Sequence, residues 1–210
     1  MTERDRLKWI YSCKDNQELC ERYNQWAQDY DAELMQDYGW QAPVLVTEFL
    51  SKYVSRDARI LDAGAGTGLV GQCLYHQGYR DLVAIDLSEN MLARARDKKV
   101  YRKLHQMVLG EPLDFPDAAF DAVVCVGVFT YGHAPASCLD ELARITRDGG
   151  YIIFIQRSDA NESLGFREKQ EQLEATGIWR LVEASDPICA FSRKEDEVPH
   201  QIWVYQVLED

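Results

Sequence analysis

The stretch Ile60-Leu61-Asp62-Ala63-Gly64-Ala65-Gly66-Thr67-Gly68 decides the fold of this 210-residue chain. Apolar residues lead into an acidic residue and then into three glycines within five positions. Because glycine adopts backbone conformations that other residues avoid, the stretch predicts a tight turn between a strand and a helix. A helix that begins at such a turn offers amide hydrogens and the positive end of its dipole to a small anionic group.

Strand and helix patterns alternate on both sides of this turn. The predicted strands are 59–63, 82–85, 104–109, 120–126 and 151–156, and the predicted helices are 69–77, 89–99, 136–146 and 165–176. Strands that are joined through helices pair in parallel. The strand at 120–126 is apolar almost throughout, which is typical of the centre of such a sheet. Gly149-Gly150 predicts a turn ahead of the strand at 151.

The two ends of the chain carry different patterns. The first fifty residues place aromatic side chains at helical spacing, and Pro43 fits the first turn of a helix that runs to about Tyr53. At the other end, strands at 179–184 and 200–208 are joined by a charged loop, 193–197, which predicts an antiparallel hairpin. The expected architecture is one α/β domain, with a helical cap at 1–55 and a doubly wound, mostly parallel seven-stranded sheet at 56–210.

The composition of the chain argues against several classes of partner. The net charge is −12, and residues 106–210 carry 8 basic and 19 acidic side chains, so we expect no nucleic-acid partner. No apolar stretch approaches the roughly 20 residues of a membrane span, and no secretion signal is visible, so we expect no membrane partner and a cytoplasmic location. Six cysteines lack Cys-x-x-Cys or zinc-ligand spacing, and we expect no metal site.

Two kinds of nucleotide compete for the glycine turn. Residues 66–71 satisfy the dinucleotide fingerprint, and Asp86 follows Gly66 by twenty residues, where a carboxylate can accept hydrogen bonds from both ribose hydroxyls. Asp62, however, would bring a negative charge close to a pyrophosphate. A nucleoside that carries an amino group would gain from the same charge. The residues therefore favour an amino acid joined to a nucleoside, and a nicotinamide dinucleotide remains the alternative.

Four stretches, 62–68, 86–92, 115–121 and Gly149-Gly150, resemble the class I S-adenosylmethionine-dependent methyltransferases in order and spacing. More narrowly, residues 23–31, 110–113 and 176–179 are similar to the methyltransferase-like protein 27 group of that family. One departure is Arg147-Asp148, where the family commonly has Lys-Pro. The resemblance implies a Rossmann-like fold, S-adenosyl-L-methionine as cofactor and S-adenosyl-L-homocysteine as product.

The resemblance also assigns roles to individual residues. It implies that Asp62 and the turn hold the methionine part, that Asp86 holds the ribose, and that Leu87 and Met91 flank the adenine. Residues 111–113 would lie at the adenine edge, Val126 and Phe129 beneath the sulfonium, and Tyr23 and Tyr30 over the cofactor. The full predicted cofactor set is Tyr23, Tyr30, Asp62, Gly64, Ala65, Gly66, Gly68, Asp86, Leu87, Met91, Glu111, Pro112, Leu113, Val126 and Phe129.

Methyl transfer is an in-line displacement, so the protein mainly has to align the two reactants. A base is needed only when the acceptor is protonated, and His133 and Tyr131 are the candidates. Arg157 and Asp159 could shape the acceptor pocket. We expect a small, neutral or cationic acceptor and a monomer or weak dimer. The alternatives are an NAD(P)-dependent oxidoreductase and a non-catalytic module that binds S-adenosylmethionine.

Overall fold

The structure is a computed structural model that describes residues 3–193 and 198–209. Residues 194–197, most of the predicted charged loop, lie outside the described residues. The helices are α1 (Glu3–Tyr11), α2 (Asn16–Trp26), α3 (Tyr30–Ala32), the π-helix η1 (Glu33–Tyr38), α4 (Ala42–Ser51), α5 (Leu69–His76), α6 (Glu89–Asp97), α7 (Cys138–Ile145), α8 (Ser158–Ser163) and α9 (Phe166–Ala175). The strands are β1 (Arg59–Ala63), β2 (Asp81–Asp86), β3 (Lys103–Gln106), β4 (Phe120–Val126), β5 (Thr146–Arg157), β6 (Trp179–Ala184) and β7 (His200–Val207).

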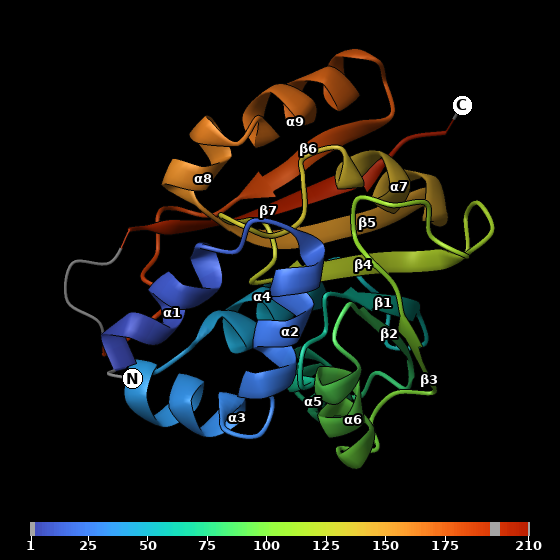
Figure 1. Ribbon diagram of the computed structural model, residues 1–210. Coiled ribbons are helices and arrows are strands. Elements are labelled where there is room, and N and C mark those ends of the chain that lie inside the picture. Colours follow the sequence, from blue (N-terminus) through green and yellow to red (C-terminus); the bar gives the residue numbers. More distant parts are fainter. Residues whose placement is uncertain (1–2, 194–197, 210) are drawn as a thin grey trace.

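The seven strands form one sheet in the order β3-β2-β1-β4-β5-β7-β6 (Figure 1). Strands β1 to β5 pair in parallel, whereas β7 runs antiparallel to both β5 and β6. The prediction of a doubly wound, mostly parallel sheet with an antiparallel C-terminal pair is therefore confirmed. The apolar strand β4 occupies the centre of the strand order, as its sequence predicts.

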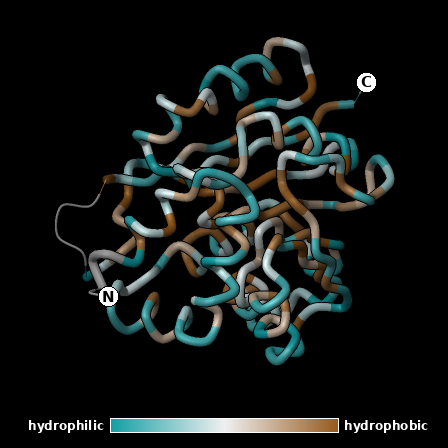
Figure 2. The backbone as a smooth tube through the Cα atoms, viewed as in Figure 1, coloured by the Kyte–Doolittle hydropathy of each residue, from teal (hydrophilic) through white to brown (hydrophobic). Residues whose placement is uncertain are grey.

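The central strands bury alternate side chains in two separate hydrophobic layers. One layer joins Ile60 and Val124 to helices α4 and α5, and the other joins Leu61 and Val123 to helices α7 and α9. This alternation follows from the two-residue period of a strand. Figure 2 shows the hydrophobic segments gathered in the middle of the molecule and hydrophilic ones along the outer helices. Both faces of the sheet are covered, as a parallel sheet requires.

The structure corrects two predicted boundaries. Strand β3 ends at Gln106 and not at Leu109, because the chain leaves the edge of the sheet there. The double glycine lies within β5 and does not precede it. At Gly150 an added Cβ would lie 2.7 Å from the backbone oxygens of Arg147 and Asp121, so glycine permits a close backbone approach where the register shifts. The short helix α8, which follows β5 directly, was not predicted from the sequence.

The N-terminal helices form a cap over one edge of the sheet. Ile10, Leu19 and Trp26 belong to the same hydrophobic cluster as Val126, the last residue of β4, and Ile155, near the end of β5. In Figure 1 these helices, in blue, lie beside and in front of the sheet. The cap therefore covers the edge where the parallel strands end. Across the described residues, no helix is both long and apolar enough to cross a bilayer.

Candidate functional site

The glycine turn is held by backbone hydrogen bonds between β1 and β2. The amides of Gly64 and Ala65 both donate to the carbonyl oxygen of Ile85 at 2.9 Å. Gly64 has φ of +78°, and a Cβ there would lie 2.3 Å from Val128, so a side chain is excluded. At Gly66, by contrast, an added Cβ would meet nothing within 4 Å. The turn therefore presents bare backbone to the space above the sheet.

Asp86 lies at the end of β2 and is fixed by the backbone around it. Its Oδ2 accepts the amide of Gly66 at 2.8 Å, and its Oδ1 accepts the amide of Ser88 at 2.9 Å. The side chain is 7% exposed, and this burial raises the pKa of its carboxyl to about 6. Each carboxylate oxygen has further lone pairs, so the group can accept additional donors from a ligand. Gly66 and Asp86, which lie twenty residues apart in the sequence, are thus in direct contact.

Asp62 is buried beneath the turn together with Tyr101, a residue that sequence reasoning missed. The Tyr101 hydroxyl donates to Asp62 Oδ2 and accepts the Gly71 amide at 3.1 Å. Asp62 Oδ1 has no hydrogen-bond partner among the described residues, and burial raises the pKa of this carboxyl to about 7. A Cβ on Gly71 would lie 2.2 Å from the Tyr101 ring, so the glycine makes room for that ring. The close pairing of a glycine with a distant aromatic leaves no local signal in the sequence.

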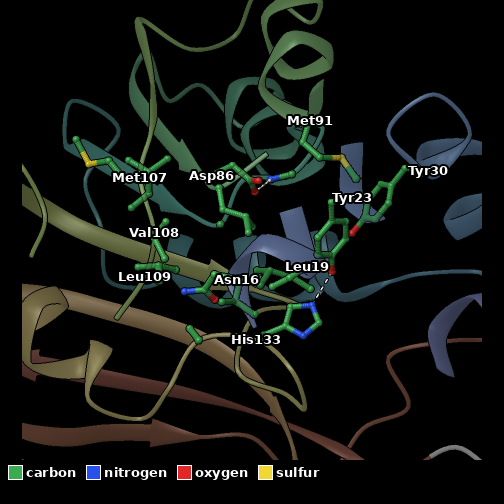
Figure 3. Close-up of a pocket in the computed structure, with 18 residues that line it drawn as sticks. Asn16, Leu19, Tyr23, Tyr30, Asp86, Met91, Met107, Val108, Leu109 and His133 are labelled. Atoms are coloured by element: carbon green, nitrogen blue, oxygen red, sulfur yellow. Dashed lines mark hydrogen bonds between the residues drawn. The ribbon is translucent and has the colours of Figure 1, made fainter. Parts of the chain in front are cut away.

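A cavity opens between the glycine turn and the cap (Figure 3). Its volume is about 60 Å³, which is small beside the roughly 300–1,000 Å³ of small-molecule pockets. The lining residues are Asn16, Leu19, Tyr23, Tyr30, Gly64, Gly66, Ile85, Asp86, Leu87, Met91, Met107, Val108, Leu109, Val126, Gly127, Val128, His133 and Ala134. The cavity thus lies between the carboxyl ends of β1, β2 and β4 and helix α2 of the cap.

The structure brings together many of the predicted site residues in this cavity, but others lie elsewhere. Residues 111–113 do not line it; Met107, Val108 and Leu109 take the expected position beside Asp86 (Figure 3). The Leu113 amide donates to Glu141 on α7 at 2.8 Å. This hydrogen bond holds residues 111–113 away from the cavity. Phe129 packs between Phe154 and Phe166 in the core. Asp62, at the end of β1, and the turn residues Ala65 and Gly68 are not among the residues that line the cavity.

Tyr23 on α2 and His133 after β4 point toward one another across the cavity (Figure 3). The Tyr23 oxygen lies 2.7 Å from His133 Nε2, and His133 Nδ1 lies 2.7 Å from the carbonyl oxygen of Tyr131. A carbonyl can only accept, so Nδ1 carries the proton and Nε2 accepts the tyrosine hydroxyl. Burial lowers the pKa of the imidazole to about 4. His133 is therefore neutral at physiological pH, and its second nitrogen is bonded to the cap.

Further polar contacts hold the cap against the glycine turn and α6. Asp31 accepts the Thr67 hydroxyl and pairs with Lys98, whose Nζ lies 2.6 Å from Asp31 Oδ2 and 2.8 Å from the Thr67 carbonyl oxygen. On the other side, Asn24 Oδ1 accepts the Ser88 hydroxyl at 2.7 Å and the Asn90 amide at 3.1 Å. These contacts join residues that lie 31 to 67 positions apart. They fix the cap over the cavity through side chains.

Tyr131 lies away from the cavity. Its hydroxyl is 2.9 Å from Ser163 Oγ on α8, and its ring lies 5.9 Å from the guanidinium carbon of Arg157. Tyr131 contributes to the cavity only through the carbonyl that orients His133. No group of three or more potential metal ligands occurs in the described part of the chain.

The residues present fit the two ends of S-adenosylmethionine. Asp86 offers acceptor oxygens to ribose hydroxyls, and Leu87, Met91 and Met107 provide apolar surface for a purine. The orphaned Oδ1 of Asp62, beneath the bare turn, suits a nearby ammonium group because a buried carboxylate oxygen without a partner is costly. The site thus combines an acceptor for ribose, an apolar slot and a buried acid.

Comparison with known proteins gives concordant results. A family model described as a methyltransferase domain matches residues 61–154. Human Methyltransferase-like protein 27 is 32% identical over 184 residues, which cover 84% of this chain and 74% of that protein. A structure of a methyltransferase in complex with the Haloferax volcanii Trm112 methyltransferase activator aligns with a TM-score of 0.68 and 18% identity over 89% of this chain and 98% of that chain. The [4+2]-cyclase SpnF aligns with a TM-score of 0.70 and 14% identity over 94% and 98%.

The chain belongs to the S-adenosylmethionine-dependent methyltransferases and is an enzyme of that class. The sequence resemblance is confirmed by the human relative, and the Rossmann-like methyltransferase fold by the solved structures. Membership of this family leaves the nicotinamide-dependent alternative without support.

Proposed function

We propose that this methyltransferase binds S-adenosyl-L-methionine in the cavity between the glycine turn and the cap, and transfers its methyl group to a small-molecule acceptor. The observation that carries the proposal is the position of Asp86, held by the Gly66 and Ser88 amides so that its remaining lone pairs face the cavity. In this role Asp86 accepts the ribose hydroxyls, and Leu87 and Met91 contact the purine. The product left in the site is S-adenosyl-L-homocysteine.

The protein contributes alignment and the exclusion of water. When bound, the cofactor would supply a methyl group on a positively charged sulfur; the acceptor atom would form a bond to the methyl carbon while the electron pair of the carbon–sulfur bond passes to sulfur. Tyr23 and Tyr30 present aromatic faces to the cavity, and such a face stabilises a nearby cation by about 0.5–2 kcal/mol. Holding both reactants at near-attack distance contributes roughly 7–11 kcal/mol. Closure of the cap over Asp86 would supply both effects.

His133 serves this reaction by orientation more than by proton transfer. Its pKa of about 4 and its bond to Tyr23 make it a weak base in the closed state. Tyr131 is turned toward Ser163 and takes no direct part. We therefore assign His133 to positioning the Tyr23 ring. An acceptor that is already unprotonated at its reacting atom needs no base.

Cap and sheet act as one unit in this proposal. Core residues of the cap and of the sheet share one hydrophobic cluster, and the cavity is lined from both. A single domain over residues 1–210 follows, with the cap acting as a lid. The small cavity supports an open form of the lid, because the cofactor must enter before the lid closes.

Calorimetric titration tests the cofactor assignment. We expect S-adenosylhomocysteine to bind the unmutated protein and to bind Asp86→Ala at least about 30-fold more weakly. Asp114→Ala, in an acid outside the lining residues, is the matched control and keeps full affinity. Absence of binding to the unmutated protein overturns the proposal.

The alternative of a non-catalytic module needs a separate experiment, because the fold is shared with the [4+2]-cyclase SpnF. Incubation with methyl-labelled cofactor and a small-metabolite extract should give a labelled product below the size of a protein. Label that appears only on protein would show that the acceptor is a macromolecule. Cofactor binding without any labelled product would favour the binding module.

A further inference from the structure

A second, smaller cavity lies beside the first one, at the same edge of the sheet. It has a volume of about 20 Å³ and is lined by Tyr11, Trp40, Gly127, Phe129, Thr130, Ile155, Arg157 and His200. Gly127 lines both cavities, and a Cβ at that position would first meet Trp40 at 3.7 Å. Because glycine carries no side chain, the two cavities are separated there by backbone alone. A molecule in one cavity can therefore lie next to a molecule in the other.

The polar groups of this second cavity are mainly hydrogen-bond donors. Arg157 supplies a guanidinium, and Tyr11 and Thr130 each supply a hydroxyl. Thr130 is 6% exposed, and its Oγ1 has no hydrogen-bond partner in the described part of the chain. Among the residues that the structure describes, no Asp or Glu lines the cavity. A buried hydroxyl without a partner, next to a cation, fits a ligand that offers acceptor oxygens.

The ion pair of Arg157 is arranged so that its positive end faces the cavity. Arg157 Nε and Nη2 donate to Asp159 at 3.0 and 2.8 Å, which leaves the Nη1 amino group free of Asp159. The Arg157 side chain is 15% exposed and the Asp159 side chain 37% exposed. Water therefore screens the carboxylate more than the guanidinium. The side chain with a formal charge that lines the cavity is thus Arg157, although the second half of the chain is strongly acidic.

Aromatic side chains complete the enclosure. The Arg157 guanidinium carbon lies 5.4 Å from the Tyr11 ring, and Tyr11 is the last residue of α1 in the cap. Trp40 and Phe129 add apolar walls. A volume of about 20 Å³ holds roughly one water-sized group, so only the end of a ligand fits while the cap is closed. A carboxylate is a compact monoanion whose two oxygens can accept from a guanidinium and a hydroxyl together, and the cavity has to widen to admit its three heavy atoms.

We propose that this second cavity binds the carboxylate of the methyl acceptor through Arg157, Tyr11 and Thr130, with the rest of the acceptor extending past Gly127 toward the first cavity. The proposal rests on the proposed function and specifies the substrate class of the same site. It differs from the expectation of a neutral or cationic acceptor, because the Arg157 guanidinium lines the cavity. Arg157 acts as a substrate-binding residue, and Asp159 holds its guanidinium in place.

The first test uses protein saturated with S-adenosylhomocysteine and three carboxylates, acetate, hexanoate and benzoate, each beside its neutral primary amide. We expect at least one carboxylate to bind at least 10-fold more tightly than its amide. In Arg157→Gln this preference is lost, whereas Arg167→Gln, which removes an exposed arginine that is also paired with an acid, keeps it. Equal binding of acids and amides, or a preference that survives in Arg157→Gln, overturns the proposal.

Asp159→Asn gives a second variant with the opposite expected sign. It removes the negative charge beside the guanidinium while Asn Oδ1 can still accept one of its hydrogen bonds, so the carboxylate should bind more tightly, by about 2- to 10-fold. This variant keeps the proposal testable if Arg157→Gln fails to fold, which loss of S-adenosylhomocysteine binding would reveal. Unchanged or weaker carboxylate binding in a folded Asp159→Asn protein contradicts the proposal. Phenyl phosphate that binds more tightly than benzoate would also overturn it, because the site would then be one for phosphate.

A product assay separates this proposal from the proposed function. Metabolite extract is treated with carbodiimide and methylamine, which convert carboxylates into amides, and is then offered with methyl-labelled cofactor. We expect labelled product to fall at least 10-fold relative to extract treated with methylamine alone. Full product from the amidated extract overturns the carboxylate site and leaves the methyltransferase proposal intact. Failure of S-adenosylhomocysteine to bind at all overturns both.

Discussion

The two sides of the main cavity are built in different ways. On the sheet side, the glycine turn and Asp86 are joined through backbone amides of Gly66 and Ser88. On the cap side, the contacts run between side chains, such as Tyr23 with His133 and Asp31 with Lys98. The amides that hold Asp86 directly follow β1 and β2 and are placed by the sheet, whereas contacts between two side chains can break while the sheet stays intact. We therefore propose that the sheet side recognises the cofactor and that the cap controls access to the cavity.

The largest effect should follow from breaking the sheet side at Asp86. In Asp86→Ala the Gly66 and Ser88 amides lose their acceptor, and each unsatisfied buried donor costs about 1–3 kcal/mol. We expect the affinity for S-adenosylhomocysteine to fall at least about 30-fold, measured by calorimetry, together with a lower melting temperature. Asp86→Asn keeps one acceptor oxygen, so its affinity for S-adenosylhomocysteine should lie between those of the unmutated protein and Asp86→Ala. An affinity in Asp86→Ala within a factor of three of the unmutated protein would contradict the central role of Asp86.

A second change tests the support beneath the turn. In Gly71→Ala the new methyl group would overlap the Tyr101 ring, and such overpacking costs about 1–3 kcal/mol. We expect that loss in the free energy of unfolding, measured by denaturant titration. Tyr101→Leu removes both the bulk and the bond to Asp62. Because the two residues are in contact, the double variant should be less destabilised than the sum of the single ones; additive losses would refute the contact.

A change of pH tests the same acid without a mutation. Burial raises the pKa of Asp86 to about 6, so the carboxyl becomes protonated below that pH and loses acceptor capacity for ribose. Affinity for S-adenosylhomocysteine should fall as the pH drops through 6, by about tenfold between pH 7 and pH 5. Stability of the free protein has the opposite sign. The raised pKa values of Asp62 and Asp86 mean that their favourable contribution is present at low pH and is lost as the pH rises through 6 to 7.

Calorimetry across pH 5 to 8 checks the binding, and thermal denaturation of the free protein checks the stability. Asp86→Asn cannot ionise at that position and should show a flatter binding profile. An affinity that stays constant from pH 8 to pH 5 would argue that Asp86 does not touch the ligand.

The smallest effect should come from the cap. Tyr23→Phe removes one hydrogen bond, worth about 0.5–1.5 kcal/mol, between the cap and His133. We expect S-adenosylhomocysteine to dissociate about 2- to 10-fold faster, measured by stopped flow, with little change in melting temperature. Tyr30→Phe, which lines the same cavity and has no bond to His133, is the control. His133→Phe should have the same effect as Tyr23→Phe. A dissociation rate that is unchanged in both variants would show that the Tyr23–His133 hydrogen bond does not control access to the cavity.

The predicted fold agrees with the structure where the signal is local. The strand at 120–126 is buried on both faces and lies at the centre of the order, because its composition alone requires two covering layers. The strand predicted at 104–109 is shorter, since the edge of the sheet ends where the neighbouring strand ends. Helix α8 was missed because its six residues carry no apolar period.

The sequence by itself determined the glycine turn, the pairing of Asp86 with it and the order of strands and helices. These features depend on neighbouring residues and on the chirality of parallel strand connections, so they can be predicted from one amino-acid sequence. Only the tertiary structure decided that Tyr101 supports Asp62, that His133 bonds to Tyr23, and that Arg157 and Thr130 line a second cavity. Such contacts join residues far apart along the chain, and their geometry is set by packing, which leaves no pattern in the sequence.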